Sequence, residues 1–203
     1  MLRPGANYEN IRCEVARLVE DYGLSDLPID VFSLAEKMGL KVIFSSKLAD
    51  KLKRIEREAS SLPPGITIYD EKEQRFIVMI DDEGTFLARQ RFSLAHEIGH
   101  IRLGHDEQNP INETEAEIFA HQLLVPTALA IKIPDHLANL EFLEKTFGIA
   151  KSTARISLRY RQDRLTNCNR KQRDYEKIIV HHLGASLASH IERYERELKH
   201  GIS

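Results

Sequence analysis

The chain of 203 residues has no tryptophan, only two cysteines and no long apolar run. Cys13 and Cys168 are too few to cross-link a fold of this size, and they do not form a CxxC pair, so a disulfide framework is not expected. No stretch approaches the roughly 20 consecutive apolar residues of a membrane span. Glu9 and Glu14 come early, with no apolar core near them, so a secretory leader is not expected either. These absences predict a cytoplasmic protein with reduced thiols and no membrane contact.

The composition that remains is typical of a folded chain. Hydrophobic residues make up 42% and charged residues 30%, and neither a low-complexity tract nor a Gly-X-Y repeat occurs. This composition excludes intrinsic disorder and a collagen-like fibre. The length allows one domain with a hydrophobic core, or a core domain with a small appendage.

Basic residues are concentrated near the C-terminal end. Residues 1–163 hold 21 basic and 26 acidic residues, whereas residues 164–203 hold eight basic and five acidic ones. The strongest bias lies in residues 151–173, where Asp163 is the one acid among eight basic residues. The eight are Lys151, Arg155, Arg159, Arg161, Arg164, Arg170, Lys171 and Arg173. Such a block predicts an anionic partner or a solvated basic face.

Hydrophobic periodicity predicts an α+β chain with a small sheet and helices on one side of it. Helices are expected over residues 10–22, 31–38, 47–59, 86–103 and 112–125, and a strand over residues 40–44. The β-rich runs 66–69 and 75–80 are separated by a polar segment and predict a hairpin.

The helix predicted over residues 86–103 contains His96-Glu97-Ile98-Gly99-His100. Two histidines four residues apart project from one helix face, about 6 Å apart, and can share a metal ion. Neutral histidine nitrogen is a zinc ligand, and three protein ligands leave a position for water. Glu97 lies beside the metal, where it can take a proton from that water. The pattern is the HExxH motif of zincin peptidases.

A third ligand is expected among the three glutamates of residues 112–120. Glu113 and Glu117 share one helix face, while Glu115 is turned roughly 200° away from Glu113. One of the two can ligate the metal and the other can accept the second ring N–H of a ligating histidine; we favour Glu113 as the ligand. The alternative is a solvated acidic first turn that complements the helix dipole.

Two other histidines are expected to have different roles. A metzincin would need histidine at position 106 and glycine at position 103, where this chain has Asp106 and Leu103, so His105 is predicted to end the helix without binding metal. His121 is expected to be structural. Tyr69 and His121 are named only as guesses for an oxyanion donor.

Three segments, taken together, resemble the ImmA/IrrE metallopeptidases. They are Leu27-Pro28-Ile29-Asp30-Val31 with Leu34-Ala35, Arg91 to His100, and Glu113 to Pro126. The resemblance covers roughly residues 8–163. It implies a minimal zincin-like core of the gluzincin kind, with His96, His100 and Glu113 as Zn2+ ligands and Glu97 as the catalytic base. It also implies that position 117, usually Asn or Asp in the family, supports a ligand; Glu117 is long enough to reach the metal itself.

The resemblance further implies a substrate. ImmA/IrrE enzymes typically cleave a helix-turn-helix repressor, often encoded beside them, and so relieve transcriptional repression in a phage, mobile-element or stress response.

Residues 140–158 resemble a helix-turn-helix, with a short helix, a turn at Gly148 and a second helix. Ser152, Arg155 and Arg159 would then lie on the exposed side, as contacts for nucleic acid or a protein partner. The alternative is a helical hairpin that packs on the peptidase core and helps to hold the repressor. We favour the hairpin over base-specific reading of DNA, because the chain as a whole is acidic.

These patterns divide the chain into a zincin-like metallopeptidase domain (1–130), a helix-turn-helix-like segment (131–163) and a basic helical region (164–203). The leading hypothesis is a cytoplasmic zinc endopeptidase whose substrate adds, in extended form, to the edge of the 75–80 strand. The rival hypothesis is a zinc-containing regulatory protein that acts on DNA or protein through residues 138–173.

Overall fold

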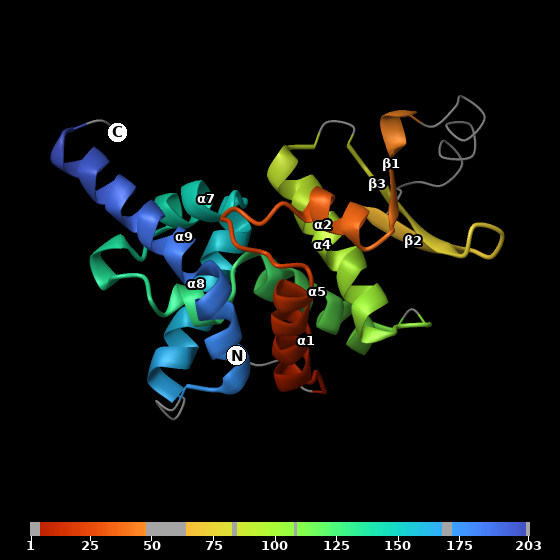
Figure 1. Cartoon of the computed structure of the whole chain (residues 1–203), viewed down its shortest axis with the longest axis horizontal. Coiled ribbons are helices and arrows are strands. Elements are labelled where there is room, and N and C mark those ends of the chain that lie inside the picture. The colour runs from red at the N-terminus through yellow and green to blue at the C-terminus, as the bar shows by residue number, and fades with distance from the viewer. Residues whose placement is uncertain (1–4, 48–63, 83–84, 108, 168–171, 202–203) are drawn as a thin grey trace. The chain divides into compact units, whose positions relative to one another are not determined.

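A computed structural model of the chain describes residues 5–47, 64–82, 85–107, 109–167 and 172–201 (Figure 1). The helix predicted over residues 47–59 lies almost wholly outside these ranges. The chain forms two compact units that interleave in sequence. One consists of Met1–Ala6 with Val31–Ala120, and the other of Asn7–Asp30 with His121–Ser203. This division differs from the three consecutive parts expected from the sequence, whereas the α+β class is confirmed.

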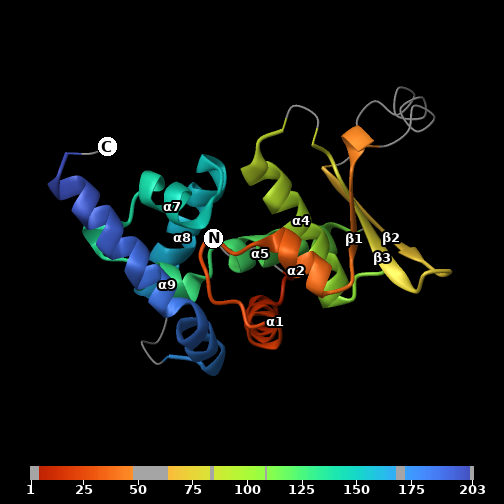
Figure 2. The same cartoon turned by 45° about the horizontal axis from the view of Figure 1, so that its top comes forward.

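The first unit is built around a three-stranded sheet, visible in Figure 2. Its strands are β1 (Lys41–Phe44), β2 (Gly65–Asp70) and β3 (Arg75–Ile80), in the order β1-β3-β2. β2 and β3 pair antiparallel as the predicted hairpin, and β1 pairs parallel with β3. The expectation that the 75–80 strand is an edge is therefore wrong. β3 is hydrogen-bonded on both sides, and β2 is an edge of this sheet.

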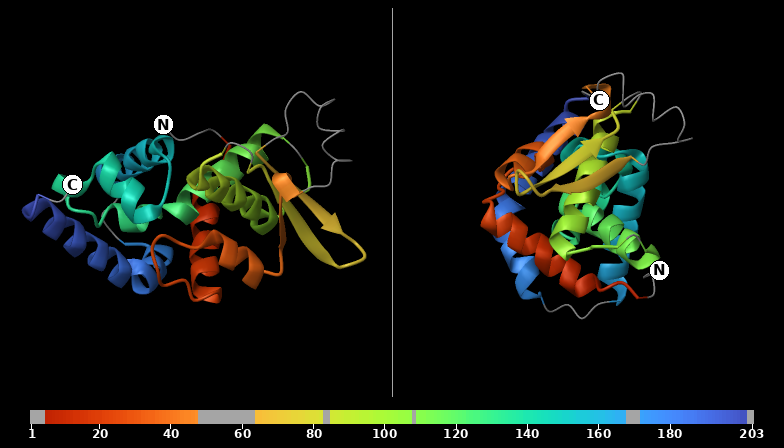
Figure 3. Two further views of the ribbon diagram at one scale, coloured as in Figure 1. Left: turned by 90° about the horizontal axis from the view of Figure 1, so that it is seen from above. Right: turned by 90° about the vertical axis from the view of Figure 1, so that its right-hand side faces the viewer.

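Two helices cover one face of the sheet, as Figures 2 and 3 show. α2 (Val31–Lys37) packs against β1, and α4 (Leu87–Leu103) packs against β2 and β3. Apolar residues spaced three or four apart on α4, such as Leu94 and Ile98, are fully buried, which is why this segment is helical here. Between β1 and the undescribed segment lies a short 3₁₀ turn, η1 (Ser45–Lys47).

α5 (Pro110–Leu124) begins two residues earlier than predicted. Asn109 accepts hydrogen bonds from the backbone N–H groups of Ile111 (3.0 Å) and Asn112 (2.9 Å), and proline is well suited to a first helical position. The helix crosses α4 at Gly99, where an added Cβ would lie 3.1 Å from the Phe119 side chain. Gly99 therefore allows the close approach of α4 and α5, on which the site depends.

The second unit is helical. Its elements are α1 (Tyr8–Asp21), α6 (Thr127–Ala130), η2 (Asp135–Leu137), α7 (Leu140–Phe147), α8 (Lys151–Asn167) and α9 (Asp174–Lys199). α9 packs against α1, α6 and α7, and α8 packs against α6 and α7. The predicted turn between α7 and α8 is present, with Gly148 in the left-handed conformation at φ 59°. Among the described residues, no helix is long and apolar enough to span a membrane.

Candidate metal centre and active site

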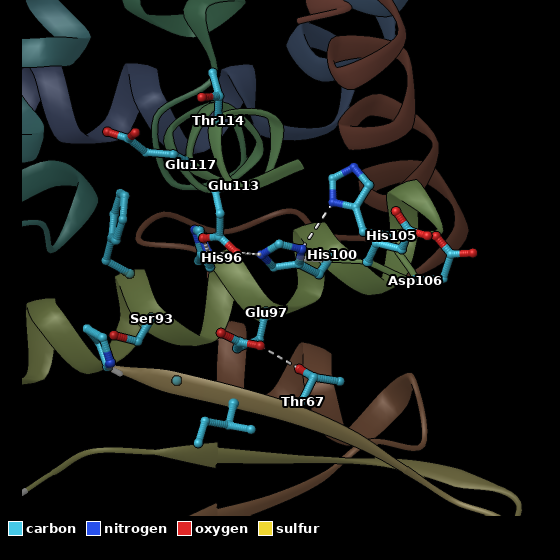
Figure 4. Close-up of a pocket in the computed structure, with 15 residues that line it drawn as sticks. Thr67, Ser93, His96, Glu97, His100, His105, Asp106, Glu113, Thr114 and Glu117 are labelled. Carbon is cyan, nitrogen blue, oxygen red and sulfur yellow. Dashed lines mark hydrogen bonds and ion pairs between the residues drawn. The ribbon is translucent and has the colours of Figure 1, made fainter. Parts of the chain in front are cut away.

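α4 and α5 bring two histidines and one glutamate together, as Figure 4 shows. The Nε2 atoms of His96 and His100 are 3.1 Å apart. Oε2 of Glu113 lies 3.3 Å from His96 Nε2, and its Oε1 lies 3.5 Å from His100 Nε2. Four ligands in a tetrahedron about 2.0–2.1 Å from zinc would be about 3.3–3.4 Å apart. The donor types and their spacing therefore fit a zinc ion, and this is the one such group found among the described residues.

The other two glutamates of α5 do not join this donor group. Glu117 lines the same pocket, but in Figure 4 its carboxylate points away from that of Glu113. Glu115 instead approaches His105, with Oε2 3.3 Å from the ring Nε2. The sequence left open whether Glu113 or Glu117 is the third metal ligand. The positions of the donor atoms favour Glu113.

Burial keeps the imidazole of His100 neutral. Its side chain is 16% exposed, and burial, together with the neighbouring His96, lowers the His100 pKa to about 4. A neutral ring has a lone pair on one of its nitrogens and can ligate a metal, whereas a protonated ring cannot. The site therefore offers a ligand in its metal-binding form at neutral pH.

Glu97 belongs to α4, its side chain contacts β2, and it is 7% exposed. The hydroxyl of Thr67 donates a hydrogen bond of 2.6 Å to its Oε2. Burial raises the pKa of Glu97 above its usual value, and the Thr67 hydrogen bond opposes this rise. A carboxylate with a raised pKa and a held orientation is suited to accept a proton in a reaction.

Gly65 gives the Glu97 side chain its space. A Cβ at position 65 would lie 2.7 Å from Oε1 of Glu97 and 2.9 Å from its Cγ, closer than real Cβ contacts. Neither Gly65 nor Thr67 was identified from the sequence. Thr67 lies in the predicted strand 66–69 and Gly65 just before it, but their role depends on how β2 packs against α4, which the sequence pattern does not reveal.

The donor group and Glu97 open into one pocket of about 520 Å³ within the first unit. The pocket is lined by the start of β2, by α4 and α5, and by the segment between these helices. The lining residues of β2 and the preceding position are Pro64, Gly65, Ile66 and Thr67. A concave site that combines a few polar groups with apolar walls is the usual form of a ligand or active site.

The two guesses for an oxyanion donor do not line this pocket. Tyr69 is 47% exposed, and its ring packs on Phe76, with centroids 5.0 Å apart. His121 belongs to the second unit, where it is buried beside Tyr160. The structural role expected for His121 fits this environment.

The basic block is only partly solvated. Ser152, Arg155 and Arg159 are exposed on α8, as predicted. Arg161 and Arg164, in contrast, are buried. Arg161 donates to the carbonyl oxygens of Ala130 (3.0 Å) and Ile133 (2.9 Å). Arg164 makes a bidentate ion pair with buried Glu176. Arg170 and Lys171 lie outside the described residues. The expectation of a solvated basic face is therefore wrong for Arg161 and Arg164, which are buried and pair with groups of their own unit.

A family model described as the IrrE N-terminal-like domain matches residues 35–159. This match covers more than half of the chain and contains β1 to β3 and both helices of the site. The chain belongs to this peptidase family. It is therefore a metallopeptidase of the ImmA/IrrE kind, and the resemblance seen in the sequence is confirmed. A search of curated proteins found no similar sequence.

Proposed function

We propose that this IrrE-like peptidase is a cytoplasmic, zinc-dependent endopeptidase that cleaves a helix-turn-helix transcriptional repressor. Cleavage would relieve repression in a phage, mobile-element or stress response. The observation that carries the enzymatic part is the buried carboxylate of Glu97 beside the donor atoms of His96, His100 and Glu113 in one pocket. Zinc is proposed because histidine nitrogen and carboxylate oxygen are its usual ligands in peptidases.

His96, His100 and Glu113 would hold the ion. When bound, zinc supplies Lewis-acid chemistry, because it polarises a peptide carbonyl and makes water more acidic. Glu97 accepts the proton of the attacking water and returns it to the leaving amine. Thr67 holds one oxygen of the Glu97 carboxylate in place, and its hydrogen bond favours the ionised form that a base requires.

An extended substrate segment would pair with β2. β2 is an edge of the described sheet, and its first residues, from Gly65 to Thr67, line the pocket. Main-chain pairing at a strand edge gives affinity without demanding particular side chains. Further along the strand, Ile68 is 58% exposed and offers apolar contact to the same segment.

Gly65→Ala is expected to lower kcat/KM by about 10- to 100-fold, because the new methyl group displaces the Glu97 carboxylate and small misplacements of a catalytic group are costly. Zinc content should not change, since the donor group is untouched. Gly184→Ala in α9 is the matched control, because its Cβ would meet only Val180, at 3.4 Å. Steady-state cleavage kinetics with metal analysis test this, and an unchanged kcat/KM would contradict it.

Thr67→Val is expected to move the acidic limb of the kcat/KM profile to higher pH by up to about one unit. The sign follows from the hydrogen bond, which stabilises ionised Glu97; its removal raises the pKa of Glu97, so a higher pH is needed to form the base. Thr67→Ser keeps the hydroxyl and should keep the wild-type limb. A limb that stays in place or moves to lower pH in Thr67→Val argues against this role.

The repressor substrate is supported by the family resemblance. The test is incubation of zinc-loaded protein with the helix-turn-helix repressor encoded nearest to its gene, with products followed by mass spectrometry. We expect one or a few defined cleavage sites with wild-type protein and none with Glu97→Gln. An intact repressor under conditions in which unstructured peptides are cut would reject this substrate and leave the peptidase assignment standing.

The exposed side of α8 supports a second, regulatory role through Ser152, Arg155 and Arg159. These residues are proposed to contact a protein partner in preference to DNA, since Arg161 and Arg164 pair internally and reduce the basic surface. A gel-shift titration at several salt concentrations separates the two partners. Steep salt dependence with a sequence preference would favour DNA.

A further inference from the structure

Two successive contacts link the donor group to a further glutamate of α5, through the side chains of His100, His105 and Glu115. Nδ1 of His105 lies 3.1 Å from Nδ1 of His100, and Nε2 of His105 lies 3.3 Å from Oε2 of Glu115. The side chain of His105 is 6% exposed and that of Glu115 is 17% exposed. Figure 4 shows the His105 ring directed at the ring of His100. The low exposure of both side chains limits competition from water for this contact. His105 lies at the end of α4 and outside the donor group, as the sequence predicted, but its contact with His100 was not predicted.

The end of α4 places His105 against His100. Gly104 is in the left-handed conformation at φ 68°, its N–H bonds to the Ile101 carbonyl, and the His105 N–H bonds to the His100 carbonyl at 3.0 Å. These are the two hydrogen bonds of a Schellman motif, in which the residue after the left-handed glycine folds back on the residue that begins the last turn. Here the motif brings two imidazole rings together, with centroids 5.1 Å apart.

The hydrogen-bond roles in this chain follow from Glu115. An ionised carboxylate only accepts, so Nε2 of His105 carries the proton and its Nδ1 is left as an acceptor. Nδ1 of His100 must then donate to His105, and the lone pair of the His100 ring lies on Nε2. That nitrogen is the one that faces His96 and Glu113. The opposite polarity would put a proton on the atom that has to bind the metal.

We propose that His105 and Glu115 are positioning residues for the metal centre, a role that rests on the proposed zinc site. They fix the ring orientation and the tautomer of His100, so that its Nε2 presents a lone pair to the ion. Partners of this kind behind a ligating histidine typically contribute a factor of 10 to 100 in metal affinity.

The test measures zinc affinity of the full chain by competition with a chromophoric chelator. His105→Leu is expected to weaken zinc binding by about 10- to 100-fold, because it removes the acceptor for His100. His105→Asn should recover most of the loss, since its side-chain oxygen can occupy the position of Nδ1. His136→Leu is the matched control, because His136 makes a similar contact of 3.2 Å with Glu195 in the second unit, and it should bind zinc like wild type.

Each outcome has a distinct meaning. Wild-type zinc affinity in His105→Leu would overturn the inference alone, as would equal losses in His105→Leu and His105→Asn, which would indicate packing of the ring. No zinc binding by the wild-type protein would contradict the proposed function, and the inference with it. In zinc-loaded, 15N-histidine-labelled wild type, NMR should find the proton of His105 on Nε2 and that of His100 on Nδ1. The reversed tautomers would overturn the inference even where a variant does not fold.

Discussion

Glu97→Gln is expected to keep one zinc ion per chain while peptide cleavage falls by about 100- to 10,000-fold. The amide has nearly the shape of the carboxylate, and its oxygen can still accept the hydrogen bond from Thr67. It cannot take a proton from water, however, so the step assigned to Glu97 is lost and the donor group is left in place. Burial raises the pKa of this carboxyl, so a neutral amide should not destabilise the fold.

The measurement pairs metal analysis with single-substrate cleavage kinetics on zinc-loaded protein. Glu20→Gln, an exposed residue of α1 in the second unit, is the matched control and should retain wild-type rates. Cleavage at the wild-type rate by Glu97→Gln at full zinc occupancy would remove Glu97 from the mechanism. Loss of zinc from this variant would instead give Glu97 a part in metal binding.

Removal of a donor is expected to abolish both zinc binding and cleavage. His96→Ala should bind no zinc at micromolar concentrations, and Glu113→Ala should bind it far more weakly than wild type, because each loses one of three closely spaced donors. Glu117→Ala should retain the metal, since its carboxylate is outside that group.

A thermal shift provides the readout for this series. A ligand that binds only the folded state stabilises it by about 4 kcal/mol at 1,000 times its Kd. Zinc should therefore raise the Tm of wild type and Glu117→Ala and leave that of His96→Ala unchanged. If Glu113→Ala retains the zinc-dependent rise and Glu117→Ala loses it, the third ligand is Glu117 and not Glu113.

Local sequence determined the elements of this protein and the pairing of its two histidines. The stops at Gly104 and Gly148, the β2–β3 hairpin and the helix of residues 87–103 all follow from interactions within a few residues. His96 and His100 are neighbours for the same reason, since any helix brings residues four apart onto one face. The segment around these histidines, taken together with residues 27–35 and 113–126, was specific enough to indicate the family. The match over residues 35–159 confirms it.

Tertiary structure decided what lies beside that pair. The selection of Glu113 depends on where α5 crosses α4, which is set by the contact of Gly99 with Phe119. The place of β3 at the centre of the sheet depends on the parallel pairing of β1, a connection across more than 30 residues that periodicity does not encode. For the same reason only the structure identified Gly65 and Thr67, which belong to β2 and contact Glu97 of α4.

The contacts of His105 fall between these two cases. The Schellman motif that turns it toward His100 is local and was open to prediction from Gly104, whereas the Glu115 carboxylate reaches it from another helix. Repeating local geometry can thus be derived from residue spacing, because each hydrogen bond in it spans a few residues. The environment that gives a site its protonation states and orientation comes from distant segments, and only their packing brings it together.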